Sequence, residues 1–170
     1  MRTSLAGILA LFTLLAMCPL QADGVDGKRA SFIQWKPSDC TNPMMLPKDQ
    51  YDASQFGKGM YRIDNVQSHG HFNNIFIIFQ AANSLTPAAV PDAVESTFAI
   101  KDQKITWRTY KTVVEGRPVI RKEALMPNIL PHQKQGEDSD YIWIRIDADS
   151  QQILDKLSPV AEGIIRDAAH

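Results

Sequence analysis

Residues 141–168, with the sequence YIWIRIDADSQQILDKLSPVAEGIIRDA, decide the fold because a strand pattern runs directly into a helix pattern there. Isoleucine occupies every second position from 142 to 146, and Tyr141, Trp143 and Arg145 occupy the positions between. Successive side chains of a strand point to opposite faces, so the isoleucines share one face and the other three residues share the opposite one. The pattern predicts a final strand at 141–146 that lies on an apolar core.

The second half of this stretch predicts an amphipathic helix. Asp149 is placed to cap its N-terminus, and Gln152 takes the capping-box position three residues later. Apolar residues then recur at spacings of one, three and four, which builds a single stripe: Ile153, Leu154, Leu157, Val160, Ala161, Ile164, Ile165 and Ala168. Pro159 interrupts the pattern, so we expect a kink there, or a restart with Ser158 as a new cap. The stripe keeps its phase, which places both parts on the same sheet face.

Further strand patterns lie upstream of this stretch. The segment Ile75–Phe79 (IFIIF) is the most apolar run after the N-terminal segment, and it predicts a central strand buried on both faces. Gly116 can supply the positive φ that a reversal at 113–117 needs, and Pro118 must lie at the start of a strand or on an edge. We expect strands at 32–35, 60–66, 75–79, 97–100, 104–110 and 119–126.

Three segments predict no regular strand. Residues 37–59 contain several prolines and glycines, so we expect an irregular course with its apolar residues buried. Residues 83–96 predict a loop with one helical turn after Pro91. Residues 128–139 predict a polar loop.

These elements predict an α+β fold, namely an antiparallel sheet of about five or six strands with a C-terminal amphipathic helix packed on one face. The order of elements over residues 72–168 resembles that of the PsbP-like α/β/α sandwich, and exported bacterial proteins of unassigned role are also built that way. The resemblance rests on element order. It implies no particular activity, because such a fold hosts many unrelated functions.

The N-terminus predicts export. Residues 1–22 contain one basic residue, an uncharged core of 14 residues from Ser4 to Met17, and a small residue, Ala22, at the expected cleavage site. The core is too short to span a membrane as a helix. Cys18 offers a lipoprotein alternative, but Met17 is bulky for that signal and Pro19 follows directly. We therefore expect a signal peptide at 1–22 and a single domain at 23–170, released into the periplasm or the medium.

Charge and cysteine content exclude further classes of protein. Without residues 1–22 the chain has 17 Lys and Arg against 19 Asp and Glu, a balance that argues against nucleic acid and gives no attraction to an anionic membrane. No second stretch is long enough to span a membrane. Cys40 is the one cysteine after the signal peptide, so the fold has no internal disulfide.

No motif in the chain specifies a chemistry. The sequence lacks the nucleophile elbow, the zinc-protease helix, the phosphate loop and the paired-cysteine motif. His69 and His71 are spaced to share a metal, but two ligands without a third define no site, so we favour a structural turn and expect no cofactor.

The composition leaves three classes of function open: a binding protein, a carrier of a metal or small ligand in the periplasm, and an enzyme without a recognisable motif. We favour the first, an exported inhibitor, immunity-type or accessory protein whose partner is another protein. Loops on a rigid sheet are where recognition residues usually lie. The turn at 68–71 and the loop at 128–140 supply the candidate partner-binding residues, which are His69, His71, His132, Lys134, Glu137 and Asp138.

The export signal gives the first testable prediction. We expect the mature protein to begin at Asp23 and to be free in the periplasm or medium, because the uncharged core and Ala22 match a cleavable signal. Intact-mass measurement of the secreted protein checks this. A diacylglycerol adduct on Cys18 would instead establish the lipoprotein alternative.

Overall fold

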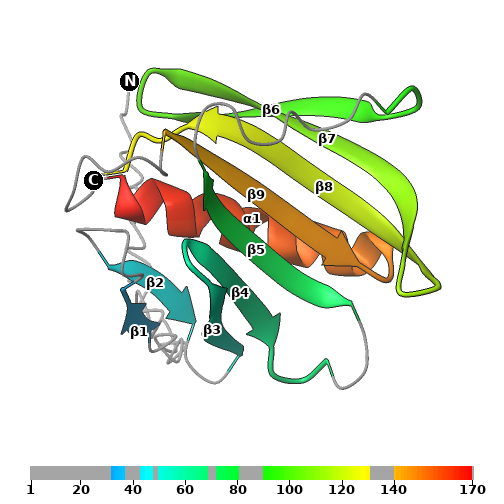
Figure 1. The fold of residues 1–170 in the computed structure, drawn as a ribbon, viewed down its shortest axis with the longest axis horizontal. Coiled ribbons are helices and arrows are strands. Elements are labelled where there is room, and N and C mark those ends of the chain that lie inside the picture. Colours follow the sequence, from blue (N-terminus) through cyan, green and yellow to red (C-terminus); the bar gives the residue numbers. More distant parts are fainter. Residues whose placement is uncertain are drawn as a thin grey trace, which may run out of the picture.

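A computed structural model describes residues 32–36, 43–47, 50–68, 72–80, 90–130 and 140–169. The predicted signal peptide, Cys18 and Cys40 lie outside these ranges. A seven-stranded antiparallel sheet dominates the structure, in the order β3-β4-β5-β9-β8-β7-β6, and a two-stranded sheet pairs β1 with β2 (Figure 1). The strands are β1 (Phe32–Trp35), β2 (Met44–Pro47), β3 (Tyr51–Gly57), β4 (Met60–Asn65), β5 (Asn73–Gln80), β6 (Val94–Ile100), β7 (Gln103–Val114), β8 (Arg117–Pro127) and β9 (Tyr141–Ala148).

Two meanders meet in the middle of the large sheet. Strands β3 to β5 form the first and β6 to β9 the second, and β9 returns to pair with β5 over its whole length, from Asn73 opposite Ala148 to Gln80 opposite Tyr141. The β7–β8 hairpin closes through Glu115 and Gly116, whose φ angles of 51° and 76° are both positive. A two-residue turn of this kind matches the twist of the strands, as expected from Gly116.

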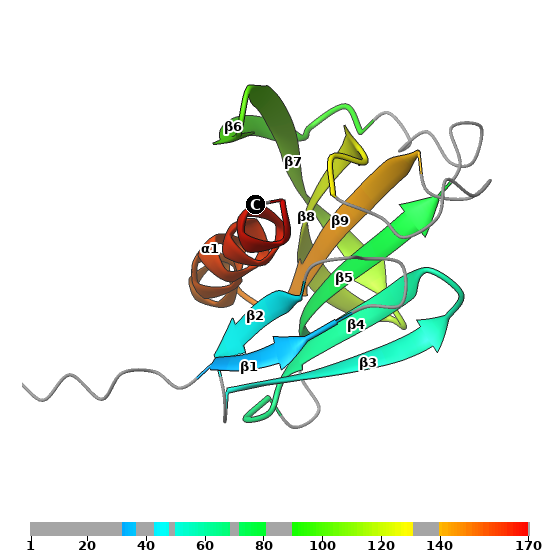
Figure 2. The ribbon, with the colours of Figure 1, turned by 90° about the vertical axis from the view of Figure 1, so that its left-hand side faces the viewer.

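The core lies on one face of the sheet. Helix α1 (Gln151–Ala168) crosses that face, and the β1–β2 sheet lies on the same side next to it (Figure 2). The three isoleucines of β9 are fully buried there against Leu154, Leu157, Ala161, Ile164 and Ile165. The apolar stripe predicted for the helix is therefore the surface that packs on the sheet. Among the described residues, no helix has the length and apolar character needed to cross a membrane.

The predicted α+β class and the packing of the C-terminal helix are confirmed, but the sequence patterns predict too few strands. Residues 37–59, expected to be irregular, contain β2 and β3. Met44 and Leu46 alternate with half-buried residues and are 0% exposed, so a two-residue period lies between the prolines at 43 and 47. Strand β3 is a polar edge strand that pairs with β4, and such strands lack the continuous apolar pattern of central ones.

The segment before β6 also differs from the expectation. Residues 94–96 belong to the strand, and the expected helical turn after Pro91 is a single turn in which Ala93 N donates to Val90 O at 3.2 Å. Residues 94–96 are exposed, since β6 is an edge strand, and therefore show no apolar alternation.

The helix begins one residue later than predicted. Ser150 is the N-cap, with extended backbone and a hydroxyl oxygen that accepts a hydrogen bond from Ile153 N. Asp149 instead ties the end of β9 to the start of β5: its carboxylate accepts from Phe72 N at 3.2 Å, and its own N–H donates to Phe72 O at 3.0 Å.

The predicted restart at Ser158 is wrong, because α1 continues through Pro159. Pro159 cannot donate to the carbonyl of Asp155 one turn earlier. Both residues lie on the exposed side of the helix, so water can hydrate the freed carbonyl. The Ser158 hydroxyl donates to Leu154 O at 2.8 Å and so acts within a continuous helix rather than as a cap.

This exposed proline gives a stability prediction. Pro159→Ala restores a backbone hydrogen bond in the helix but also frees the unfolded chain, and we expect a net gain of about 1–2 kcal/mol in the free energy of unfolding. Urea unfolding followed by circular dichroism measures it, with Lys156→Ala, an exposed site on the same helix, as the matched control. A loss of stability in Pro159→Ala would show that the proline fits the helix better than alanine.

Candidate functional site

The six predicted partner-binding residues, His69, His71, His132, Lys134, Glu137 and Asp138, lie outside the described residues. Their role stays a prediction. The described residues that flank the two segments lie at opposite ends of the sheet: Asn73 pairs with Ala148, whereas Tyr141 pairs with Gln80. Within the described part of the chain, no group of three His, Cys, Asp or Glu residues is placed to hold a metal ion.

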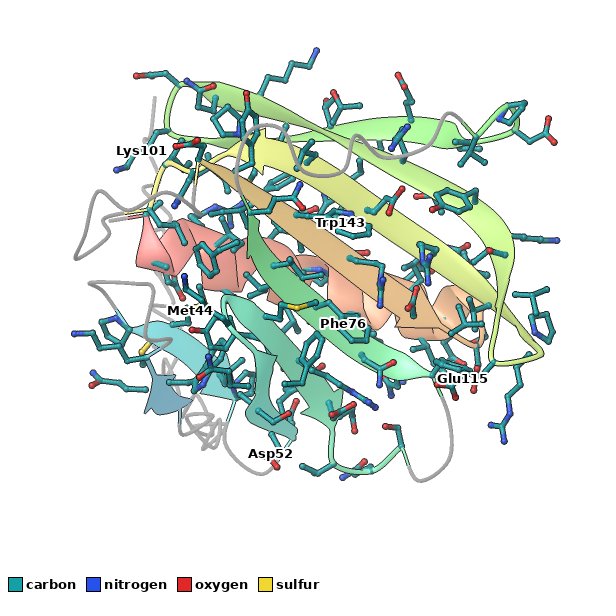
Figure 3. All side chains as sticks on the ribbon, in the orientation of Figure 1. Met44, Asp52, Phe76, Lys101, Glu115 and Trp143 are labelled. Carbon is teal, nitrogen blue, oxygen red and sulfur yellow. The ribbon has the colours of Figure 1, made fainter. Side chains whose placement is uncertain are left out.

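The face of the large sheet opposite α1 carries polar and charged side chains; we call it the helix-free face. Because strand residues alternate, each central strand presents apolar residues to the helix and polar or aromatic ones to this face. In Figure 3, Phe76 and Trp143 lie on the face turned to the viewer, with α1 behind the strands. Register aligns two rows across β4, β5, β9, β8 and β7: one is Asp64, Asn74, Asp147, Arg121 and Tyr110, and the other is Arg62, Phe76, Arg145, Glu123 and Arg108.

Asp147 is the buried carboxylate of the first row, with 1% of its surface exposed. Arg121 donates two hydrogen bonds to it, from Nε to Oδ1 at 2.7 Å and from Nη2 to Oδ2 at 3.1 Å. Burial acts to lower the pKa of Arg121, but the hydrogen bonds and negative charge of Asp147 outweigh it and raise that pKa overall. This bidentate pair neutralises the carboxylate without water.

Glu123 is the buried carboxylate of the second row, with 3% of its surface exposed. Its Oε1 accepts from the Tyr110 hydroxyl at 3.0 Å and from Arg108 Nη2 at 3.4 Å, and its Oε2 accepts from Trp143 Nε1 at 3.1 Å. Burial raises the pKa of Tyr110, and the hydrogen bond and charge of Glu123 raise it further. The carboxylate is therefore enclosed by three donors from the two neighbouring strands, β7 and β9.

Arg145 lies between these two groups and is held by aromatic rings. Its guanidinium carbon is 4.1 Å from the centre of the Phe76 ring and 5.5 Å from that of Trp143. Its Nε is 3.3 Å from Asp147 Oδ2 but is not aimed for a hydrogen bond, and this Nε is buried without a hydrogen-bond partner. Burial lowers the pKa of Arg145, and the charge of Asp147 offsets this in part.

Asn74 carries a second unsatisfied polar atom on the same face. Its Nδ2 donates to Asp64 Oδ1 at 2.6 Å, which fixes the orientation of the amide, and its Oδ1 is buried without a partner. Asn74 is opposite Asp147 and therefore diagonal to Arg145 across the β5–β9 pair. An unpaired acceptor, Asn74 Oδ1, and a donor without an acceptor, Arg145 Nε, thus lie on adjacent strands.

An open cleft of about 780 Å³ occupies this end of the helix-free face. Its wall includes Asn74 and Arg145, and Ser68 and Phe72 also line it. Phe56 is 51% exposed, and its ring meets that of Phe76 edge-on at 5.9 Å. The complete lining is Phe56, Arg62, Asp64, Asn65, Val66, Ser68, Phe72, Asn74, Phe76, Val114, Glu115, Arg117, Arg145 and Asp147.

A smaller hollow of about 350 Å³ lies at the β6–β7 hairpin, around Lys101 and Lys104. No buried polar side chain lines it, whereas the cleft on the helix-free face includes Asn74 and Asp147. We therefore take that cleft as the candidate functional site. It combines cations, aromatic rings and fixed hydrogen-bonding groups, which suits the recognition of a polar ligand or partner surface.

Sequence analysis missed this cleft because its residues come from strands that are distant in the chain. A signal exists in retrospect: Arg121 and Glu123 alternate on β8 as Arg145 and Asp147 do on β9. In an antiparallel sheet such alternation marks the face turned away from the core, where opposite charges on neighbouring strands can pair. Pairing these charges across strands requires the register, which the sequence does not provide.

The Arg121–Asp147 pair gives a prediction about stability. Arg121→Leu leaves a buried carboxylate without its main partner and should lower the free energy of unfolding by about 3–5 kcal/mol, whereas Arg121→Leu with Asp147→Leu should lose clearly less. Urea unfolding of both variants tests this, with Arg62→Gln as the exposed control, where we expect a loss of at most about 1 kcal/mol. A double variant as unstable as the single one would contradict the account.

Comparison of the chain with protein-family models, with curated proteins and with solved structures gives no match in any of the three. The resemblance to PsbP-like proteins therefore stays a prediction.

Proposed function

We propose that this protein is exported and acts by binding another protein, and that the cleft on the helix-free face is the binding surface. The observation that carries the proposal is the makeup of that cleft. Three arginines and three phenylalanines line it, namely Arg62, Arg117, Arg145, Phe56, Phe72 and Phe76. Arginine and aromatic residues are enriched in protein interfaces and among the residues that dominate their energy.

The shape of the cleft favours a protein over a small molecule as its occupant. Sites for small molecules are concave and mostly apolar, and they enclose most of the ligand. This cleft is open, its lining includes six charged residues, and Phe56 and Val66 are exposed. Exposed apolar side chains beside charged and hydrogen-bonding groups give the mixed surface that is typical of a contact between proteins.

The hydrogen-bonding state of the two buried acids favours binding over catalysis. A general base must be able to reach the proton that it removes. The carboxylate of Asp147 is held by Arg121, and that of Glu123 accepts from three donors. Groups enclosed in this way stiffen a surface, and a stiff surface loses less entropy when a partner binds. An inhibitor, an immunity-type protein and an accessory subunit all need such a surface.

The position of the cleft also agrees with one of the two segments predicted from sequence. Ser68 and Phe72, which flank residues 69–71, both line the cleft. We therefore propose that His69 and His71 contribute to partner binding. His132, Lys134, Glu137 and Asp138 stay a prediction without this support.

Phe56 provides the test of the proposed function. Phe56→Asp puts a charge on the exposed apolar surface of the cleft and should weaken partner binding by about tenfold or more, while the fold persists because the side chain is half exposed. The measurement is capture of the partner from the native culture on the immobilised protein, followed by affinity measurement with the identified partner. Val94→Asp, 69% exposed on the edge strand β6, is the matched control. Equal binding by the two variants and the unmodified protein would refute the cleft as the interface.

A further inference from the structure

The charge network of the helix-free face consists, among the described residues, of Arg62, Arg108, Arg121 and Arg145 with Asp64, Glu123 and Asp147, and within it Arg145 shares its carboxylate with a closer arginine. Three arginines of the network form close pairs: Arg62 with Asp64 at 2.8 Å, Arg108 with Glu123 at 3.4 Å, and Arg121 with Asp147 at 2.7 Å. Arg145 has its Nε 3.3 Å from Oδ2 of the same Asp147, which already pairs with Arg121. Four cations therefore meet three anions among these described residues of the helix-free face.

A guanidinium in this state is costly to the folded protein. It offers five N–H donors and accepts no hydrogen bond, and a charge that is partly removed from water needs partners. The side chain of Arg145 is 21% exposed, its Nε is buried without a hydrogen-bond partner, and burial lowers its pKa. The two aromatic rings hold its plane but do not replace an acceptor. An anion in the cleft would supply what the network lacks.

We propose that Arg145 binds the C-terminal carboxylate of an extended segment of the partner protein. A carboxylate matches the planar fork of an arginine with two parallel hydrogen bonds. The inference rests on the proposed function and deepens it, because it names the part of the partner that the cleft recognises.

Asn74 favours a chain terminus over an isolated anion. Its Oδ1 lacks a donor, and the last residue of a polypeptide carries an N–H group close to its carboxylate. Asn74 is diagonal to Arg145 on neighbouring strands, so one residue can span both positions. The side chain of that residue would then meet the exposed apolar surface of Phe56 and Val66.

The charge of the cleft favours a single carboxylate. Arg62, Arg117 and Arg145 are balanced in its lining by three acids, Asp64, Glu115 and Asp147. A segment with several negative charges would be repelled by those acids, whereas one carboxylate beside an apolar side chain would not. We therefore expect the partner to end in an apolar residue.

Three synthetic peptides test the proposal on the full chain. They are acetyl-Ala-Ala-Leu with a free C-terminus, the same peptide with an amidated C-terminus, and amidated acetyl-Ala-Asp-Ala, with acetate as a simple anion. Nuclear magnetic resonance follows the Nε–H signal of Arg145 and the amide signals of Asn74. We expect saturable shifts with the free C-terminus and binding weaker by about tenfold or more with the amidated peptide, with the aspartate peptide and with acetate.

Variants separate the site from its surroundings. Arg145→Gln should weaken binding of the free C-terminus by about tenfold or more, while Arg166→Gln, on the exposed side of the last turn of α1, should leave it unchanged. Should Arg145→Gln fail to fold, Arg145→Lys keeps the charge but not the fork, and we expect it to reduce the preference for the free C-terminus over the amidated one.

Several results would overturn the proposal. Equal binding of the free and amidated peptides would show that the carboxylate is not recognised. Equal binding of acetate would mean an adventitious ion only, and tighter binding of the aspartate peptide would point to an acidic side chain. If Phe56→Asp abolishes capture of the partner but Arg145→Gln does not, the proposed function stands and this inference fails. If the peptide binds as expected but Phe56→Asp leaves partner capture unchanged, Arg145 can bind a carboxylate, but the cleft is not the interface and both the proposed function and the assignment to the partner's C-terminus fail.

Discussion

The pairing of β5 with β9 is the constraint on which the rest of the structure depends. These two strands join the meanders. Their register places Ile75 and Ile77 of β5 and the isoleucines of β9 toward α1, and it places Phe76 and Arg145 together on the other face. A slip by one residue would turn Arg145 and Asp147 into the core and the isoleucines out of it. One register therefore determines both the apolar core under the helix and the charge network on the helix-free face.

The charge network reinforces that register at a cost. Removing Asp147 and Glu123 from water opposes folding, and the ion pairs and hydrogen bonds recover that free energy only where the geometry is good. Good geometry exists in the native register: Arg121 meets Asp147 from β8, and Trp143 and Tyr110 meet Glu123 from β9 and β7. In any shifted pairing a buried carboxylate would lose its donors. The network therefore penalises the wrong alignments of the sheet more than it stabilises the right one.

Sequence patterns predicted the parts of this fold whose signal is local. The alternation of β9, the stripe of α1 and the reversal at Gly116 each depend on residues within one or two turns, and all three are confirmed. Elsewhere tertiary contacts overrode the local signal. Met44 and Leu46 form a strand beside prolines because α1 covers them, and Asp149 gives up the cap position because it bonds to the start of β5. The cleft was not predicted for a related reason. Its residues come from several strands, and no single strand carries a recognisable motif.

The helix-free face differs from the solvated face of an ordinary antiparallel sheet in where its charges lie. On such a face, charged groups extend into water and each can be replaced at little cost. Here the central carboxylates are buried by the side chains of neighbouring strands, and the cations around them are drawn into the same layer. Water can therefore form few further hydrogen bonds with the buried carboxylates of this layer. Among the described residues of the network, Arg62, Arg108, Arg121 and Arg145 meet three carboxylates, and the carboxylate proposed for the partner would supply a fourth.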